Sequence, residues 1–368
     1  MVVIVTVAVL AVGTPTGRRP AAPAARSSAT IPRYYVTISR YVVPLQAVVL
    51  DSANGQVTGA VTVPAVVRPD IAAITAAADD RSFIISNYDI GPAGTIDYPL
   101  FRLRISATGR PAPLAELLVI PLPVPATTVG GSALSPDGTK VAISLQYQVA
   151  GVDSIPYRAI EVIDLVTRVT RTWTAPRDDY SSWPGSPSWA DGDTMIAFTW
   201  WHSTGRPGRI SASSTEVREL DAATAGTDLL DSRVIVPAGG IGDLESALIT
   251  PDGKAVIAAV YQDHPASDGQ RGTLVAQIIE LLPDTGRIVA VARTQTAHYA
   301  SLAERATLIE TARVLAVDAT GEHAIVQCFQ LGRLGIGLVG PGHPSVGFGQ
   351  FTVLPAAPAS DPQVAVAW

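Results

Sequence analysis

Apolar and polar residues alternate along many short stretches of this chain, and turn-forming residues separate one stretch from the next. The alternation is clear in Arg158–Leu165 and again in Val169–Thr174. A period of two places successive side chains on opposite faces, which is typical of β-strands. Long patterns with a helical period are scarce, and the best of them, Ser301–Glu310, predicts only one short helix or a loop. The pattern therefore predicts an all-β protein.

One hairpin pattern occurs twice in closely similar form. Gly131–Leu145 contains a short apolar stretch, a Pro-Asp-Gly turn at 136–138 and a second apolar stretch. Glu245–Ala259 repeats this order around the Pro-Asp-Gly turn at 251–253. Such a turn between two apolar stretches predicts a β-hairpin. A hairpin that recurs along a chain predicts a repeat architecture.

Turns of two kinds alternate along the chain with one common spacing. The first kind precedes an apolar strand and lies at Asp80, Asp137, Gly192, Asp252 and Gly321. The second kind follows an apolar strand and lies at Gly55, Gly109, Arg168, Gly226, Gly286 and Gly342. Two interleaved series with the same spacing predict a unit of four strands, A to D in chain order, which is one blade of a β-propeller.

The turns of the second kind predict six four-stranded antiparallel blades over residues 31–368. In the third blade we expect the four strands at 131–134, 140–146, 158–165 and 169–174. The first blade lacks an innermost strand, because Arg33–Ser39 reads like a second strand, whereas Gln363–Trp368 reads like an innermost one. We therefore expect the C-terminal strand to join the first blade and close the ring, which also removes an exposed strand edge.

The repeat resembles a known family. Ser135–Ile143 and Trp189–Phe198 are similar to the TolB-type, WD40-like propeller repeat. The Arg-Tyr-Tyr-Val sequence at 33–36 resembles the opening of uncharacterised actinobacterial propellers. The chain departs from TolB in its longer units and in having no mixed domain of the TolB kind before them. The resemblance implies the propeller fold but little about function, because propellers serve as binding proteins, lyases, hydrolases and scaffolds.

Residues 1–30 precede the repeats and differ from them in composition. Met1–Val12 is almost wholly apolar but too short to span a bilayer, which takes about 20 residues. Arg18 and Arg19 follow, and Pro20–Thr30 is a linker rich in Pro, Ala and Ser. The run resembles part of a signal or anchor segment, so we expect an extracytoplasmic or membrane-tethered protein. The alternative is a cytoplasmic protein in which the run is a docked β-strand.

Composition narrows the classes of function. The 368 residues are 47% hydrophobic and 16% charged, which allows a large core and does not fit disorder. The net charge is -6 and the basic residues form no stripe, so we expect no nucleic-acid partner. Lysine occurs only at Lys140 and Lys254, which is typical of a high-GC bacterium. Cys328 is the only cysteine and lies in an apolar run, which predicts a buried residue and excludes a disulfide within the chain.

The two kinds of connection predict which face of the propeller is used. In antiparallel blades the A–B and C–D turns share one face, and the B–C and D–A loops share the other. The turns are tight here and the loops are long, and long loops on a rigid scaffold commonly carry function. The long loops and the strand ends beside them hold the candidate binding residues, which are Asp178, Asp179, Tyr180, Trp183, Trp200, Trp201, His202, His264, His298 and Tyr299.

These aromatic and polar residues predict a non-catalytic surface that binds a protein, a peptide or a glycan. The alternative is that the tryptophans only pack between neighbouring blades. Asp178 and Asp179 lack the spaced oxygen ligands of a calcium loop, and the five histidines lack His-Glu-x-x-His spacing, so we expect no metal and no cofactor.

A second class of function stays open, a lyase or hydrolase with its site at the mouth of the central channel. Asp, Glu or His side chains that converge on the channel mouth would favour this enzyme. An apolar, aromatic rim would favour the binding protein.

Overall fold

Strands account for nearly all of the regular structure. The computed structural model describes residues 31–39, 44–64, 73–87, 89–90, 96–122, 128–148, 156–175, 182–204, 212–224, 228–239, 241–265, 272–301, 312–330, 333–339, 352–353 and 364–368. Residues 1–30 form a separate unit outside these ranges, and residues 31–368 form the unit described below. Within the described ranges the one helical element is the 3-10 turn η2 (Leu229–Asp231), and no helix is long and apolar enough to cross a membrane. The short helix predicted at Ser301–Glu310 falls almost entirely outside the described residues.

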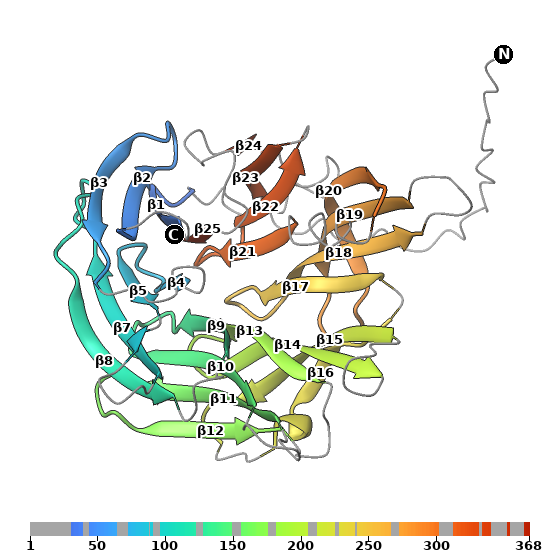
Figure 1. Ribbon diagram of the computed structural model, residues 1–368, viewed down its shortest axis with the longest axis horizontal. Coiled ribbons are helices and arrows are strands. Elements are labelled where there is room, and N and C mark those ends of the chain that lie inside the picture. The colour runs from blue at the N-terminus through green and yellow to red at the C-terminus, as the bar shows by residue number, and fades with distance from the viewer. Residues whose placement is uncertain are drawn as a thin grey trace, which may run out of the picture. The chain divides into compact units, whose positions relative to one another are not determined.

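The described strands form six antiparallel sheets, five with four strands and one with five, which follow one another along the chain (Figure 1). The first sheet contains β25 (Val364–Ala367), β1 (Tyr34–Ser39), β2 (Gln46–Asp51) and β3 (Val57–Thr62). The second contains β4 (Ala73–Ala76), β5 (Ser82–Ser86), β6 (Asp89–Ile90), β7 (Ile96–Arg104) and β8 (Ala115–Leu122). The third contains β9 (Thr128–Leu134), β10 (Lys140–Gln148), β11 (Pro156–Asp164) and β12 (Thr170–Thr174).

The remaining sheets have the same plan. The fourth contains β13 (Trp183–Ala190), β14 (Met195–Thr204), β15 (Ala212–Asp221) and β16 (Arg233–Val236). The fifth contains β17 (Asp243–Ile249), β18 (Val256–His264), β19 (Gly272–Leu281) and β20 (Ile288–Tyr299). The sixth contains β21 (Arg313–Val317), β22 (Ala324–Gln330), β23 (Arg333–Val339) and β24 (Thr352–Val353). Four-stranded antiparallel sheets that repeat in this way are the blades of a β-propeller, as the turn series predicts.

Two sheets differ from the prediction of four strands with tight turns at one end and long loops at the other. The second sheet has five strands because its second strand is broken, and both pieces, β5 and β6, pair with β7. The break follows Asn87, which is buried and donates a side-chain hydrogen bond of 3.0 Å to the carbonyl of Pro64. In the fourth sheet, β15 and β16 are joined by residues 222–232, which include η2, and not by the predicted tight turn.

The C-terminal strand belongs to the first sheet. β25 pairs with β1 in antiparallel register, with Val36 opposite Ala367 and Ser39 opposite Val364. In Figure 1, β25 at the red end of the colour scale lies beside blue β1. The predicted pairing of these two segments is therefore confirmed for the residues in this register.

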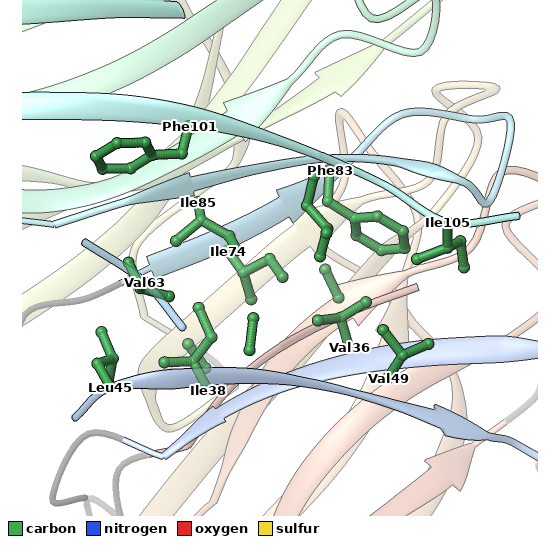
Figure 2. Packing of buried hydrophobic residues seen from close by; sticks show 14 of the residues in the cluster. Val36, Ile38, Leu45, Val49, Val63, Ile74, Phe83, Ile85, Phe101 and Ile105 are labelled. Atoms are coloured by element: carbon green, nitrogen blue, oxygen red, sulfur yellow. The ribbon is translucent and has the colours of Figure 1, made fainter. Parts of the chain in front are cut away.

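Apolar clusters join each sheet to the next. Val36, Ile38 and Phe83 belong to the cluster between the first and second sheets, and Figure 2 shows the side chains of this cluster pointing toward one another. Four further clusters join the second sheet to the third and so on to the sixth. Another cluster joins the sixth sheet to the first, because Ile325 of β22 packs with Tyr35 and Trp368.

The innermost strand of each sheet leaves backbone groups that no neighbouring strand pairs, and side chains satisfy several of them. An unpaired buried N–H would cost free energy comparable to a lost hydrogen bond. The bonds between sheets run from Leu134 N to Thr75 Oγ1 (2.9 Å), from Ile249 N to Ser188 Oγ (3.1 Å), from Val314 N to Ser246 Oγ (2.9 Å) and from Trp189 Nε1 to Ala133 O (3.0 Å). Space is also short here, since a Cβ at Gly131 would lie 2.9 Å from the Cα of Ser186 in the next sheet.

The repeated Pro-Asp-Gly hairpin has the same local structure in both copies. In the first, the N–H of Gly138 donates to the carbonyl of Ser135 (2.8 Å), and Gly138 has a φ of 72°, which favours glycine. The Asp137 carboxylate accepts from the Ser135 hydroxyl (2.6 Å) and the Thr139 N–H (2.8 Å). Although burial acts to raise it, these hydrogen bonds lower the pKa of Asp137 to about 2. The copy at 250–253 makes equivalent contacts.

The antiparallel order places these hairpin turns at one end of the second to sixth sheets and the longer loops at the other end. We call the first end the tight-turn face, and it contains the turns at 78–81, 136–139, 191–194, 251–254 and 319–322. We call the opposite end the long-loop face, where β13 begins and β14 ends.

Deleting residues 363–368 should strongly destabilise the protein. β1 would lose one of its two partner strands, and buried residues such as Tyr35 and Val36 would become exposed beside a free edge. We expect the Tm to fall by about 10 °C or more, or the variant to aggregate. Val169→Ala, at a position that is 56% exposed, is the control and should leave the Tm unchanged. A deletion variant with the Tm of the wild type would contradict the pairing.

Candidate functional site

Two tryptophans stack at the long-loop end of the fourth sheet. Trp183 begins β13 and Trp201 lies near the end of β14, and the antiparallel register places them directly opposite each other. Their ring centroids are 5.6 Å apart and their planes differ by 7°. Both residues are partly exposed. The two strands therefore hold a stacked and partly exposed pair of aromatic rings beside the long loops, which we call the tryptophan pair.

Trp200 lies on the other face of β14 from Trp201, as the period of two requires. It is fully buried and packs edge to face against Phe198, with 6.4 Å between ring centroids. It also packs edge to face against His202 at 6.0 Å. Trp200 thus belongs to the core between the third and fourth sheets, and its ring packs against His202 from the side of this core.

A chain of hydrogen bonds, which we call the His202 network, crosses the fourth sheet on the face opposite to the tryptophan pair. Ser182 Oγ lies 3.3 Å from His202 Nδ1, and His202 Nε2 lies 3.2 Å from Glu216 Oε1. Arg218 donates from Nε to the same oxygen of Glu216, at 2.6 Å. Ser182 and His202 are each next to one of the paired tryptophans in the sequence, so the network fixes the backbone on both sides of the pair.

Sequence reasoning found His202 but missed Ser182, Glu216 and Arg218. A weak signal existed, because Glu216 and Arg218 are two residues apart in a strand and must share a face. Their closeness to His202 depends on the register between β14 and β15, which places Trp200 opposite Glu216. A long loop separates these two strands in the sequence, so the alternation of residue types alone does not determine which of their residues pair.

The other candidates lie at the long-loop end of the fifth sheet. Thr273 of β19 is opposite His264 of β18 on one side and His298 of β20 on the other. Both histidines are exposed, and His298 Nδ1 lies 3.0 Å from Thr273 Oγ1. Tyr299 is buried and donates a hydrogen bond of 2.7 Å to Asp263. The structure therefore divides the described candidates between two sheets.

Three candidates, Asp178, Asp179 and Tyr180, lie outside the described residues. Across the parts of the chain that the structure describes, no group of three or more His, Cys, Asp or Glu side chains could hold a metal ion.

A cavity of about 130 Å³ lies where the innermost strands converge. Its lining takes residues from β4, β9, β13, β17, β21 and β25, which is one strand from each sheet. Its polar side chains are those of Thr75, Ser132 and Ser188, and Trp189 and Trp368 form aromatic walls. Among the described residues that line it, no side chain is charged and none is a histidine. These side chains therefore offer no general acid or base.

Carboxylates gather at the tight-turn face, and Asp80 stands out among them. Burial, together with the charges of Asp318 and Asp79, raises the pKa of Asp80 to about 6, and nearby Arg81 offsets only part of this shift. Asp318 behaves in the opposite way. Burial acts to raise its pKa, but hydrogen bonds from His323 and other groups outweigh burial and lower the pKa.

Comparisons with known proteins support the fold. No family model matches the sequence, and no curated protein matches it significantly. TolB from Acinetobacter baumannii is similar in structure, with a TM-score of 0.51 and 13% identity over 91% of this chain, which spans 66% of that protein. A putative TolB from Agrobacterium tumefaciens gives a TM-score of 0.43 and 13% identity over 91% of this chain and 96% of that one. The tricorn protease gives a TM-score of 0.42 and 11% identity over 91% of this chain and 30% of that one.

The likeness to TolB from Acinetobacter baumannii confirms the predicted resemblance to TolB-type propellers at the level of fold. Identity this low says nothing about a shared partner or activity. The actinobacterial origin stays a prediction.

Asp80→Asn should make stability less dependent on pH. Since folding raises the pKa of Asp80 from 3.8 to about 6, the folded state binds this proton more tightly than the unfolded chain does. The free energy of unfolding of the wild type should therefore fall as the pH rises from 3.8 to about 6. Asp80→Asn has no carboxyl group that can titrate at this position, so it should not lose stability in this way. Above pH 6 it should be more stable than the wild type by up to about 1 kcal/mol, after allowance for solvent screening. Below the lower pKa the two proteins should be equally stable.

Urea unfolding at a series of pH values measures this difference. Asp191→Asn is the matched control, because Asp191 and Asp80 both occupy turns with positive φ, 47° and 53°. An equal gain for Asp80→Asn at every pH would contradict the raised pKa.

Proposed function

We propose that the six sheets are the blades of one closed propeller and that this protein is a non-catalytic binding module. Three observations support the closed ring. β25 pairs with β1, Ile325 of the sixth sheet packs with Tyr35 and Trp368 of the first, and one cavity takes its lining from the innermost strands of all six sheets.

The tryptophan pair is the observation that carries the binding function. Aromatic side chains are common anchors of interfaces, and truncating one anchor commonly costs about 2 kcal/mol or more. Trp183 and Trp201 are stacked on each other and held by strand register, so a partner that binds them loses little side-chain entropy. The partner is a protein, a peptide or a glycan that meets the long-loop face. The proposed surface also includes His202, His264 and His298, together with Asp178, Asp179 and Tyr180, whereas Tyr299 is buried and supports it through its hydrogen bond to Asp263.

The uncharged cavity supports a binding module over an enzyme at the channel mouth. A lyase or hydrolase needs acid, base or nucleophile side chains that converge on one point. The cavity lining supplies only three hydroxyl side chains, from Thr75, Ser132 and Ser188, and no partner base among its residues.

A hydrolase is the second candidate, and one observation favours it. His202 lies between the hydroxyl of Ser182 and the carboxylate of Glu216, which is the order of groups that activates a serine nucleophile. Two observations weigh against it, since Ser182 is only 2% exposed and Glu216 is already bonded by Arg218. Covalent labelling of Ser182 by a fluorophosphonate, lost in Ser182→Ala, would establish the hydrolase.

We place this activity outside the cytoplasm or on a membrane surface. The apolar run Met1–Val12 and the linker Pro20–Thr30 support this location. Fractionation of native cells tests it, and recovery wholly in the cytosol would overturn it.

Trp201→Ala should weaken partner binding about 30-fold, because it removes one anchor and unstacks the other. Wild-type protein is first screened on peptide and glycan arrays, and each ligand that binds is titrated against both proteins. Trp201→Phe keeps an aromatic face and should recover part of the affinity.

Val166→Ala is the matched control on the tight-turn face, where Val166 is 76% exposed. It should bind like the wild type. Ligands that bind Trp201→Ala as well as the wild type, or arrays with no ligand at all, would contradict the proposed site.

A further inference from the structure

The cavity reaches the tight-turn face, on the other side of the molecule from the tryptophan pair. Ala78, Pro136, Pro251 and Ala319 line it, and each of them belongs to a turn of that face. Its volume of about 130 Å³ is close to that of an engineered apolar cavity of about 150 Å³ that binds benzene. Its size and its lining therefore suit an apolar group no larger than one small ring.

The first sheet leaves a gap among the tight turns. In the other sheets a short turn joins the two innermost strands, but β25 and β1 come from distant parts of the chain. Trp368, which follows β25, lies at this place and lines the cavity. The turn that holds Asp80 and the turn that follows Asp318 belong to the second and sixth sheets, which flank the first.

Negative charge is concentrated beside this gap. The field of Asp318 reaches Asp80, and Asp79 adds to it, whereas Arg81 compensates only in part. His323 bonds Asp318 at 2.9 Å and packs edge to face against Trp368 at 6.4 Å, so His323 links the Asp318 carboxylate to the cavity wall. Repulsion between carboxylates is relieved when a cation lies near them.

We propose that this cavity binds a small organic amine. Its ammonium group lies beside Asp80 in the field of Asp318, and its apolar body enters the cavity between Trp189 and Trp368. The indole of Trp368 can also attract a cation directly, whereas Lys140 Nζ already lies over the ring of Trp189, 5.9 Å from its centroid. An anion would meet the carboxylates of Asp79, Asp80 and Asp318, and a bare metal ion would find no group of three ligands among the described residues.

The test uses benzylamine as the probe, with benzyl alcohol as its neutral analogue and benzoate as an anion of similar size. Calorimetry and tryptophan fluorescence are followed for the full-length wild type, since two of the six tryptophans line the cavity. We expect saturable binding of benzylamine that is about tenfold tighter than that of benzyl alcohol, and no binding of benzoate.

Three variants locate the site. Asp80→Asn should weaken benzylamine about tenfold and leave benzyl alcohol unchanged, whereas Asp191→Asn, the matched turn variant, should bind like the wild type. Ala78→Phe, which places a ring at an exposed lining position, should block both probes. Trp201→Ala should bind benzylamine normally, so this inference and the long-loop proposal succeed or fail separately.

No saturable binding of benzylamine would overturn the inference. Binding of benzoate as tight as that of benzylamine, or equal losses in Asp80→Asn and Asp191→Asn, would also overturn it.

Discussion

The rest of the structure depends on how the innermost strands of the sheets meet. These strands are not paired with one another, yet they are close enough that a Cβ at Gly131 would clash with Ser186. The innermost strands therefore have unpaired backbone N–H groups and little space for side chains. Serine and threonine suit this place, because they are small and their hydroxyls accept hydrogen bonds from backbone N–H groups of the next sheet. Thr75, Ser188 and Ser246 each do so. The same small residues leave space at the centre, so the cavity follows from the packing.

The antiparallel order divides the chemistry between two faces. Aspartates collect on the tight-turn face because the turns need them: Asp137 accepts hydrogen bonds from Ser135 and Thr139 and so holds its hairpin in shape. Several such turns lie close together, so the charge of Asp318 adds to the effect of burial and raises the pKa of Asp80. The connections on the long-loop face are not tight turns of this kind and do not need such aspartates. There the strand ends hold Trp183 and Trp201 in a stack. One face is thus acidic and built of turns, and the other carries the aromatic surface.

Much of the fold could be predicted from the sequence, because local signals determine it. The alternation and the Pro-Asp-Gly turn predicted the third sheet within a few residues at each strand end. The period of two also accounts for the different burial of Trp200 and Trp201, which lie on opposite faces of β14. The break after Asn87 was not predictable, since it involves a contact with Pro64 far along the chain. The His202 network and the raised pKa of Asp80 were missed for the same reason: each joins residues from different strands or sheets, whose proximity only the tertiary structure creates.

The central claim is that the six sheets form one closed ring whose first sheet is completed by the C-terminal strand. Hydrogen exchange followed by mass spectrometry tests it most directly, because strands locked in a closed ring open only when the whole domain unfolds. Peptides covering β1 and β25 should exchange together, and as slowly as those covering β10 in the third sheet. Rapid exchange of β1 and β25, while β10 stays protected, would show that the first sheet opens at this point and that the ring is not closed there.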